Sequence, residues 1–255
     1  MINELYKYRQ LLKSNIRKEI RGKYKGSFLG ILWSFVNPLL SVLVYAIVFP
    51  LVLKNTQPHY VTYLIIGIIP WTFFTTSISQ GTTTVLVNGG IIKKVYFPRE
   101  ILPISVVSSA LVNFLISCII IFIFLILSGI GISKFIVIMP LIIIIQYIFI
   151  LAIVFITSAV NVYIRDAEYI INFFVNMLFY ATPILYSSDL FPARFKWILN
   201  FNPMALIING YRDILYYQKL PEVMSLMTLF VIAFLLLLLG ILIFKKLEKG
   251  FAEEV

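Results

Sequence analysis

Residues that could do covalent or acid–base chemistry are few in this chain of 255 residues. It has one cysteine, Cys118, and one histidine, His59, too few for an intramolecular disulfide or a thiolate metal cluster. On the side expected to lie outside, the candidate acids are Asp189, Asp213 and Glu222, scattered among connecting segments. A catalytic site needs acid, base or nucleophile gathered in one cavity. We therefore expect no catalytic residue, no metal site and no bound cofactor in this chain.

Charged residues are excluded from most of the chain. Hydrophobic residues make up 61% and charged residues 13%, against roughly 45–50% and 25% in soluble domains. Six intervals of at least 20 residues contain no Asp, Glu, Lys or Arg, and a helix needs about 20 residues to cross a hydrocarbon core of ~30 Å. We expect an all-α polytopic membrane protein with six transmembrane helices, at about 28–53, 61–88, 103–128, 135–163, 169–187 and 223–244.

The distribution of Lys and Arg sets the orientation of these spans. With the N-terminus inside, the inner segments hold 15 Lys and Arg residues and the outer segments hold six. An excess of positive charge marks the cytoplasmic side. Both termini are therefore expected to be cytoplasmic, with residues 245–255 as a cytoplasmic tail. Insertion and contact with anionic membrane lipid explain the net charge of +10, so we expect no nucleic-acid partner.

The first 25 residues are predicted to form an amphipathic helix in the headgroup plane. Apolar side chains recur every three or four residues from Ile2 to Ile20, and basic side chains occupy the other face. This interface helix is either a membrane anchor or a contact for a cytoplasmic partner. Its candidate residues are Arg17, Arg21, Lys23 and Lys25.

The connection at 89–103 has the composition of a docking surface. The connection begins with Gly89-Gly90 and ends at Pro103. These residues indicate a short helix over about 89–100 that exposes aromatic residues among charges. An ordinary inner loop with positive charges is the alternative. The candidate residues are Lys93, Lys94, Val95, Tyr96, Phe97, Pro98, Arg99 and Glu100.

The segment between the fifth and sixth spans is 34 residues long and rich in aromatic residues. Asn202-Pro203 predicts a break between two short helices. Irregular backbone facing lipid is too costly, so this segment lies at the interface or re-enters the membrane against protein. It is either an interfacial anchor or, over 189–220, an outer gate above a pathway.

The spans also constrain the energy source. None contains an ionisable side chain, whereas proton-driven carriers generally use an intramembrane Asp, Glu or His. No G-x-x-x-x-G-K-[ST] phosphate-binding loop occurs in the chain. Active transport would thus need a separate motor polypeptide, with ATP and Mg²⁺ bound there. Sodium coupling through the hydroxyl groups of the second span is the autonomous alternative.

Several motifs in order resemble the membrane subunit of ABC-2-type exporters, in the branch that exports O-antigen, capsule or teichoic acid polysaccharides. The resemblance runs the length of the chain. Its markers are RGKYKGSFLGILW at 21–33, NP at 37–38, KKVYFPRE at 93–100, NVYIRD at 161–166, TPILY at 182–186, NP at 202–203 and YR at 211–212.

The resemblance implies a single transmembrane domain over 26–250 in the bacterial cytoplasmic (inner) membrane. It implies a homodimer bound to two ATP-binding cassette subunits, with 93–100 as the coupling helix and the outer segment as gate helices. The cargo would be a polyprenyl-diphosphate-linked glycan, and an exported drug or lipid is the alternative within the same superfamily. The TPILY, NP and YR motifs supply the gate residues that the resemblance implies, which are Pro183, Asn202, Pro203, Tyr211 and Arg212.

A path for a sugar chain would run along the seam of the dimer, because twelve helices can part more widely than six. Aromatic side chains on this seam would stack on sugar rings. The candidate path residues are Tyr45, Trp71, Phe73, Phe74, Phe174 and Tyr180. The basic residues of the interface helix are candidates for attracting the diphosphate.

Overall fold

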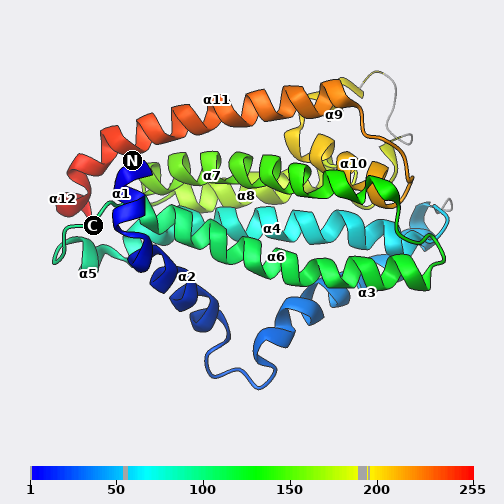
Figure 1. Cartoon of the computed structure of the whole chain (residues 1–255), viewed down its shortest axis with the longest axis horizontal. Coiled ribbons are helices and arrows are strands. Elements are labelled where there is room, and N and C mark those ends of the chain that lie inside the picture. The colour runs from blue at the N-terminus through cyan, green and yellow to red at the C-terminus, as the bar shows by residue number, and fades with distance from the viewer. Residues whose placement is uncertain (1, 54–56, 189–193, 195) are drawn as a thin grey trace.

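The computed structural model describes residues 2–53, 57–188, 194 and 196–255 (Figure 1). All regular structure among these residues is helical. The α-helices are α1 (Ile2–Lys7), α2 (Arg9–Tyr24), α3 (Trp33–Leu53), α4 (Tyr60–Val87), α5 (Gly89–Ile92), α6 (Ile101–Leu127), α7 (Met139–Tyr163), α8 (Ala167–Ala181), α9 (Lys196–Phe201), α10 (Pro203–Leu215), α11 (Val223–Leu247) and α12 (Phe251–Glu254). Short 3-10 helices occupy Gly30–Leu32, Lys134–Ile138 and Glu248–Gly250.

Five helices in the described part of the chain are long and apolar enough to cross a membrane. These candidate spans are Trp33–Leu51, Tyr60–Val87, Ile101–Leu127, Lys134–Tyr163 and Val223–Glu254. The prediction of a helical, multi-pass membrane protein is confirmed. The expected fifth span at 169–187 overlaps α8, which ends at Ala181 and has only 15 residues.

A proline explains the early end of α8. Thr182 precedes Pro183 and has an extended backbone, with φ −101° and ψ 132°. The proline ring disfavours the helical conformation in the residue before it. At 1.5 Å per residue, α8 covers only ~22 Å. The chain then continues without a helix through a buried stretch, Thr182–Leu185.

The long helices run side by side along the long axis of the molecule (Figure 1). Helix α4 lies at the centre and packs against α3, α6, α7, α8 and α10. Helices α3 and α11 lie at opposite edges and are largely exposed. The two ends of the chain lie together at one end of the bundle with α5, and α9 and α10 lie at the other end.

The N-terminal region contains two helices where the sequence predicts one. Tyr8 separates α1 from α2, with φ −96° and ψ 19° at this residue. Helix α2 packs against α6. The chain then reverses through Gly26, whose φ of +79° favours glycine, and enters α3.

Close approach of α7 and α11 depends on Gly240. A Cβ atom at this position would lie 2.7 Å from the carbonyl oxygen of Ala152 and 3.3 Å from Cβ of Phe155. Small residues let membrane helices approach this closely, where dispersion contacts hold them together.

We expect Gly240→Ala to lower the stability of the protein by about 1–3 kcal/mol, because the methyl group overlaps a backbone atom that cannot rotate away. Cys118 is free and buried, so a thiol-reactive dye in detergent reports the midpoint of thermal unfolding. Gly22→Ala is the matched control, because nothing lies within 4 Å of a Cβ at residue 22. Equal midpoints for the two variants would show that the α7–α11 contact tolerates the extra methyl group.

Candidate functional site

The 89–100 segment has two distinct faces. The prediction of a short helix over 89–100 is wrong beyond Ile92, where α5 ends. Residues 93–94 form a turn and residues 95–98 have no regular structure. Ile92 and Phe97 are 5% and 6% exposed and point into the core, whereas Val95 and Tyr96 are 58% and 88% exposed. The inward residues anchor the segment, and the outward pair leaves an aromatic and an aliphatic side chain on the surface, the kind of residues that form docking contacts.

The basic face of α2 lies beside this segment. Lys18 Nζ donates a hydrogen bond of 3.2 Å to Asn88 Oδ1, directly before α5. The exposed face of α2 carries Arg17 and Arg21, which line a shallow groove with Gln10, Lys13, Ser14 and Lys18. Lys25 is exposed and lies beyond the end of α2. The structure thus brings the two predicted cytoplasmic contacts together.

A cavity of about 350 Å³, lined by both apolar and polar side chains, lies between the end of α2 and helices α3, α4 and α6. Hydrogen bonds tie its wall together: Trp33 Nε1 donates to Ser27 Oγ at 2.9 Å, and Ser117 Oγ donates to the Ser34 carbonyl at 3.2 Å. The polar lining residues are Lys23, Ser27, Ser34, Asn37, Thr72, Thr76, Asn113 and Ser117. In a chain this apolar, such a gathering of amides, hydroxyls and one ammonium suits a polar, anionic or hydroxylated ligand. We call it the inner cavity.

The six predicted path residues divide into three groups. Phe73 lines the inner cavity and stacks on Phe114, with ring centroids 5.1 Å apart. Trp71 and Phe74 are buried and contact each other at 5.2 Å. Phe179, which the sequence analysis missed, contacts both Trp71 and Tyr45, with ring centroids 5.6 and 5.9 Å apart.

Phe174 and Tyr180 project from α8 and are 62% and 72% exposed. Other large apolar side chains of α8, including Phe173 and Met177, are also exposed. This helix therefore presents an aromatic face that no residue of its own chain covers in the described structure.

The five predicted gate residues gather around one irregular stretch of backbone. Asn202 caps α10 by accepting hydrogen bonds from the backbone N–H groups of Met204 and Ala205, at 3.0 and 3.2 Å. Its amide donates to Thr182 Oγ1 at 2.9 Å. Pro203 is the first residue of α10, where its missing N–H group is tolerated. The part of the predicted gate segment at 189–193 and 195 lies outside the described residues.

Arg212 is the centre of this outer cluster. It is 1% exposed, donates to the carbonyls of Pro183 and Ile184, and lies 3.6 Å from the centroid of the Tyr63 ring. A guanidinium that binds two carbonyls and stacks on an aromatic face is well accommodated when buried. Gly67 provides the space for the Arg212 guanidinium, because a Cβ atom at residue 67 would lie 3.0 Å from Arg212 Nη2.

The neighbouring Tyr211 connects α10 to two spans. Its hydroxyl donates to Gln146 Oε1 at 2.9 Å, and Gln146 Nε2 donates to the Pro70 carbonyl at 2.9 Å. The sequence analysis missed Gln146. A polar amide inside an otherwise apolar span is the signal that could have identified it.

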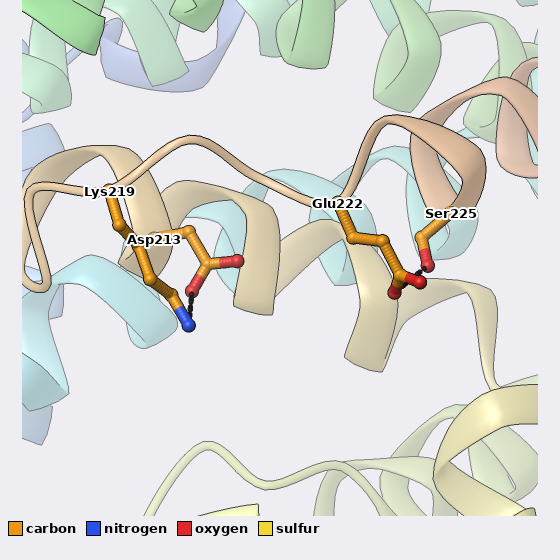
Figure 2. A network of polar contacts seen from close by, with 4 residues as sticks. All are labelled: Asp213, Lys219, Glu222 and Ser225. Atoms are coloured by element: carbon orange, nitrogen blue, oxygen red, sulfur yellow. Dashed lines mark hydrogen bonds and ion pairs between the residues drawn. The ribbon is translucent and has the colours of Figure 1, made fainter.

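Two of the three predicted outer acids, Asp213 and Glu222, have polar partners (Figure 2), and Asp189 lies outside the described residues. Asp213 Oδ1 lies 3.2 Å from Lys219 Nζ, and Glu222 Oε2 accepts a hydrogen bond of 2.8 Å from Ser225 Oγ. Burial raises the pKa of the Asp213 carboxyl, and the Lys219 ammonium opposes this shift. The Asp213–Lys219 ion pair connects the end of α10 to the turn after it, and the Glu222–Ser225 hydrogen bond lies at the start of α11.

Comparison with known proteins gives a consistent result. A family described as "ABC-2 type transporter" matches residues 10–216. The chain is 34% identical over 257 residues to the O-antigen export system permease protein RfbA of Myxococcus xanthus, covering 100% of this chain and 99% of that protein. It is 37% identical over 238 residues to a protein of the same name from Klebsiella pneumoniae, covering 92% of this chain and 91% of that protein.

We expect Arg212→Met to destabilise the outer cluster, because each buried carbonyl left without a donor costs about 1–3 kcal/mol. The measurement is the unfolding midpoint reported by Cys118 in detergent. Lys219→Ala is the control, since its side chain is 62% exposed and such pairs contribute about 0–1 kcal/mol. A midpoint for Arg212→Met equal to that of the control would contradict the structural role of the guanidinium.

Proposed function

Because the chain belongs to the ABC-2 type transporter family, we propose that it is the permease of an ATP-binding cassette exporter for an O-antigen polysaccharide. The observation that carries this function is the similarity over the full chain to proteins named as O-antigen export permeases. The cargo enters as a polyprenyl-diphosphate-linked glycan from the cytoplasmic side. The membrane is the bacterial inner membrane.

The proposed topology has six crossings with both termini in the cytoplasm. Helix α8 and the buried stretch after it form the fifth crossing, and α10 re-enters from outside to cover that stretch. Two observations support this arrangement: the chain ends lie at the same end of the bundle (Figure 1), and Arg212 of α10 donates to the carbonyls of Pro183 and Ile184 in the stretch after α8.

Energy for export comes from two partner ATPase subunits, which bind ATP and Mg²⁺. No cofactor is bound by the permease itself. The 89–100 segment is the coupling element, because its outward face offers Val95 and Tyr96 at the cytoplasmic end. The basic face of α2 forms a second contact beside it. The six spans expected from the sequence contain no Asp, Glu, Lys, Arg or His, so they offer no proton relay of their own.

A second copy of the chain completes the pathway. Exposed apolar side chains of α3 and the aromatic face of α8 are available for this contact. Phe174 and Tyr180 would lie along the resulting seam, where aromatic rings stack on sugar rings.

The inner cavity receives the diphosphate and the first sugar of the carrier lipid. Lys23 provides a cation for phosphate, and the amides of Asn37 and Asn113 provide donors and acceptors for sugar hydroxyls. Phe73 and Trp33 provide ring faces for stacking. The lipid tail stays in the bilayer beside α3.

We expect Tyr96→Ala to reduce surface polysaccharide at least fivefold at an unchanged protein level, since an exposed aromatic anchor contributes about 2 kcal/mol or more to binding. Surface polysaccharide is measured in cells whose own permease gene is deleted. Val137→Ala, at the opposite end and 82% exposed, is the control. Full export by Tyr96→Ala together with undiminished co-purification of the ATPase would refute the coupling role of this segment.

We expect Lys23→Ala to reduce export about tenfold or more, because a hydrogen bond to a charged group contributes about 1.5–3 kcal/mol. Lys25→Ala is matched in charge and exposure but lies outside the inner cavity, so it should retain most activity. Binding of the lipid-linked glycan to the purified complex gives a second readout. Equal effects of the two substitutions would indicate a general charge effect and not a site.

A further inference from the structure

Residues 245–255, the segment after the apolar part of α11, fold back against the bundle. The 3-10 helix Glu248–Gly250 turns the chain, and α12 follows. Phe251 is fully buried although Lys249 and Glu253 lie only two residues away on either side. Its ring packs against Phe244 of α11 and Tyr163 of α7, with centroids 5.4 and 6.3 Å apart. A charged tail with no structural role has no reason to bury a phenylalanine completely.

The tail is tied to the end of α7 by a second set of contacts. Tyr163 Oη donates a hydrogen bond of 2.7 Å to the Leu247 carbonyl. Gly250 lies against the same hydroxyl so closely that a Cβ atom would overlap it. The ends of α7 and α11 and the tail therefore form one packed unit.

The same tail holds both ends of the 89–100 segment. At the start, Val255 packs on Gly89, where a Cβ atom would overlap the valine side chain. At the far end, the Arg99 guanidinium donates to the Glu248 carbonyl, and Lys245 Nζ lies 3.9 Å from Glu100 Oε1. The Glu100 side chain is 5% exposed and that of Lys245 is 42% exposed, so a buried carboxylate faces an ammonium at the surface.

These contacts leave the outward face of the segment uncovered. Tyr96 stays 88% exposed while the tail occupies the opposite ends of the same segment. Gly89 and Gly90 begin the segment, and paired glycines offer little resistance to bending. Ile92 and Phe97 hold the middle of the segment against the core, and the tail contacts stiffen its two ends against a push on Tyr96.

We propose that residues 245–255 are a brace that fixes the 89–100 segment to the cytoplasmic ends of α7 and α11. A displacement that a partner applies to the segment then moves both helices as one body. The inference rests on the proposed function, because it assigns to the tail a part in coupling. Phe251 is the positioning residue at the centre of the brace.

The first test compares Phe251→Ala with Leu242→Ala in the complex purified through a tag on the ATPase. Leu242 is also a large apolar residue near the end of α11, but it is 67% exposed. We expect Phe251→Ala to keep ATP hydrolysis within twofold of wild type and to lower export at least fivefold. Leu242→Ala should change neither. Unchanged export per molecule, or a loss that follows only from less assembled complex, would overturn the brace.

A disulfide tests the same inference without removing packing. The Cβ position at residue 89 is 3.2 Å from Val255 Cβ, close to the ~3.5–4.5 Å of a disulfide. The variant is Gly89→Cys with Val255→Cys in a Cys118→Ala background, so that only this pair can form. Because the brace moves with the segment, the oxidised protein should keep at least half of the export of its reduced form.

The disulfide should also replace the lost packing when Phe251→Ala is added, so oxidation should restore export at least threefold. A disulfide that blocks export until it is reduced would show that the tail must separate from the segment, which overturns the brace. A failure of the proposed function would give a different result: the wild-type chain itself would neither bind an ATPase nor support surface polysaccharide. In that case the tail variants are not informative, whereas a working wild type makes them decisive.

Discussion

The need to satisfy backbone carbonyls inside an apolar layer governs this structure. Helix α8 stops at Ala181, and the next residues have carbonyls that no helix can satisfy. Arg212 satisfies two of them from α10, and Tyr63 covers the other side of its guanidinium. The position of α10 against the stretch after α8 and the small residue at Gly67 both serve this contact. A buried positive charge is acceptable here because its donors bind carbonyl oxygens and its face stacks on a ring.

Length and hydropathy predicted the long helices well. The expected spans at 28–53, 61–88, 103–128, 135–163 and 223–244 correspond to α3, α4, α6, α7 and α11 within a few residues. Their ends follow from charge and proline, which the sequence displays directly. The short α8 could have been anticipated from Thr182-Pro183, but charge counting alone does not detect a helix that ends inside an uncharged interval.

The faces of these helices could not be predicted in the same way. Trp71, Phe73 and Phe74 were expected along a path, yet each is at most 6% exposed in the single chain. Spans that are apolar all round carry little periodic signal to distinguish a protein-facing side from a lipid-facing side. The N-terminal helix had such a signal, and its basic face is exposed as expected, although Tyr8 divides it. Contacts of the tail were not predicted, because Phe251 is a lone aromatic residue in a charged stretch.

Polar side chains in the long helices form hydrogen bonds between these helices. Such hydrogen bonds occur toward both ends of the molecule. Tyr211 and Gln146 join α10 to α7 and to the Pro70 carbonyl of α4 near the outer end. Thr82 donates to Thr157 at 3.0 Å and joins α4 to α7 again in the inner half. At the inner end, α4 leads through Asn88 into α5, and α7 ends at Tyr163 under the tail. Helix α4 thus continues into the 89–100 segment, and α7 ends against the tail that contacts this segment. Through the Tyr211–Gln146–Pro70 hydrogen bonds, the same two helices also contact α10, which carries Arg212.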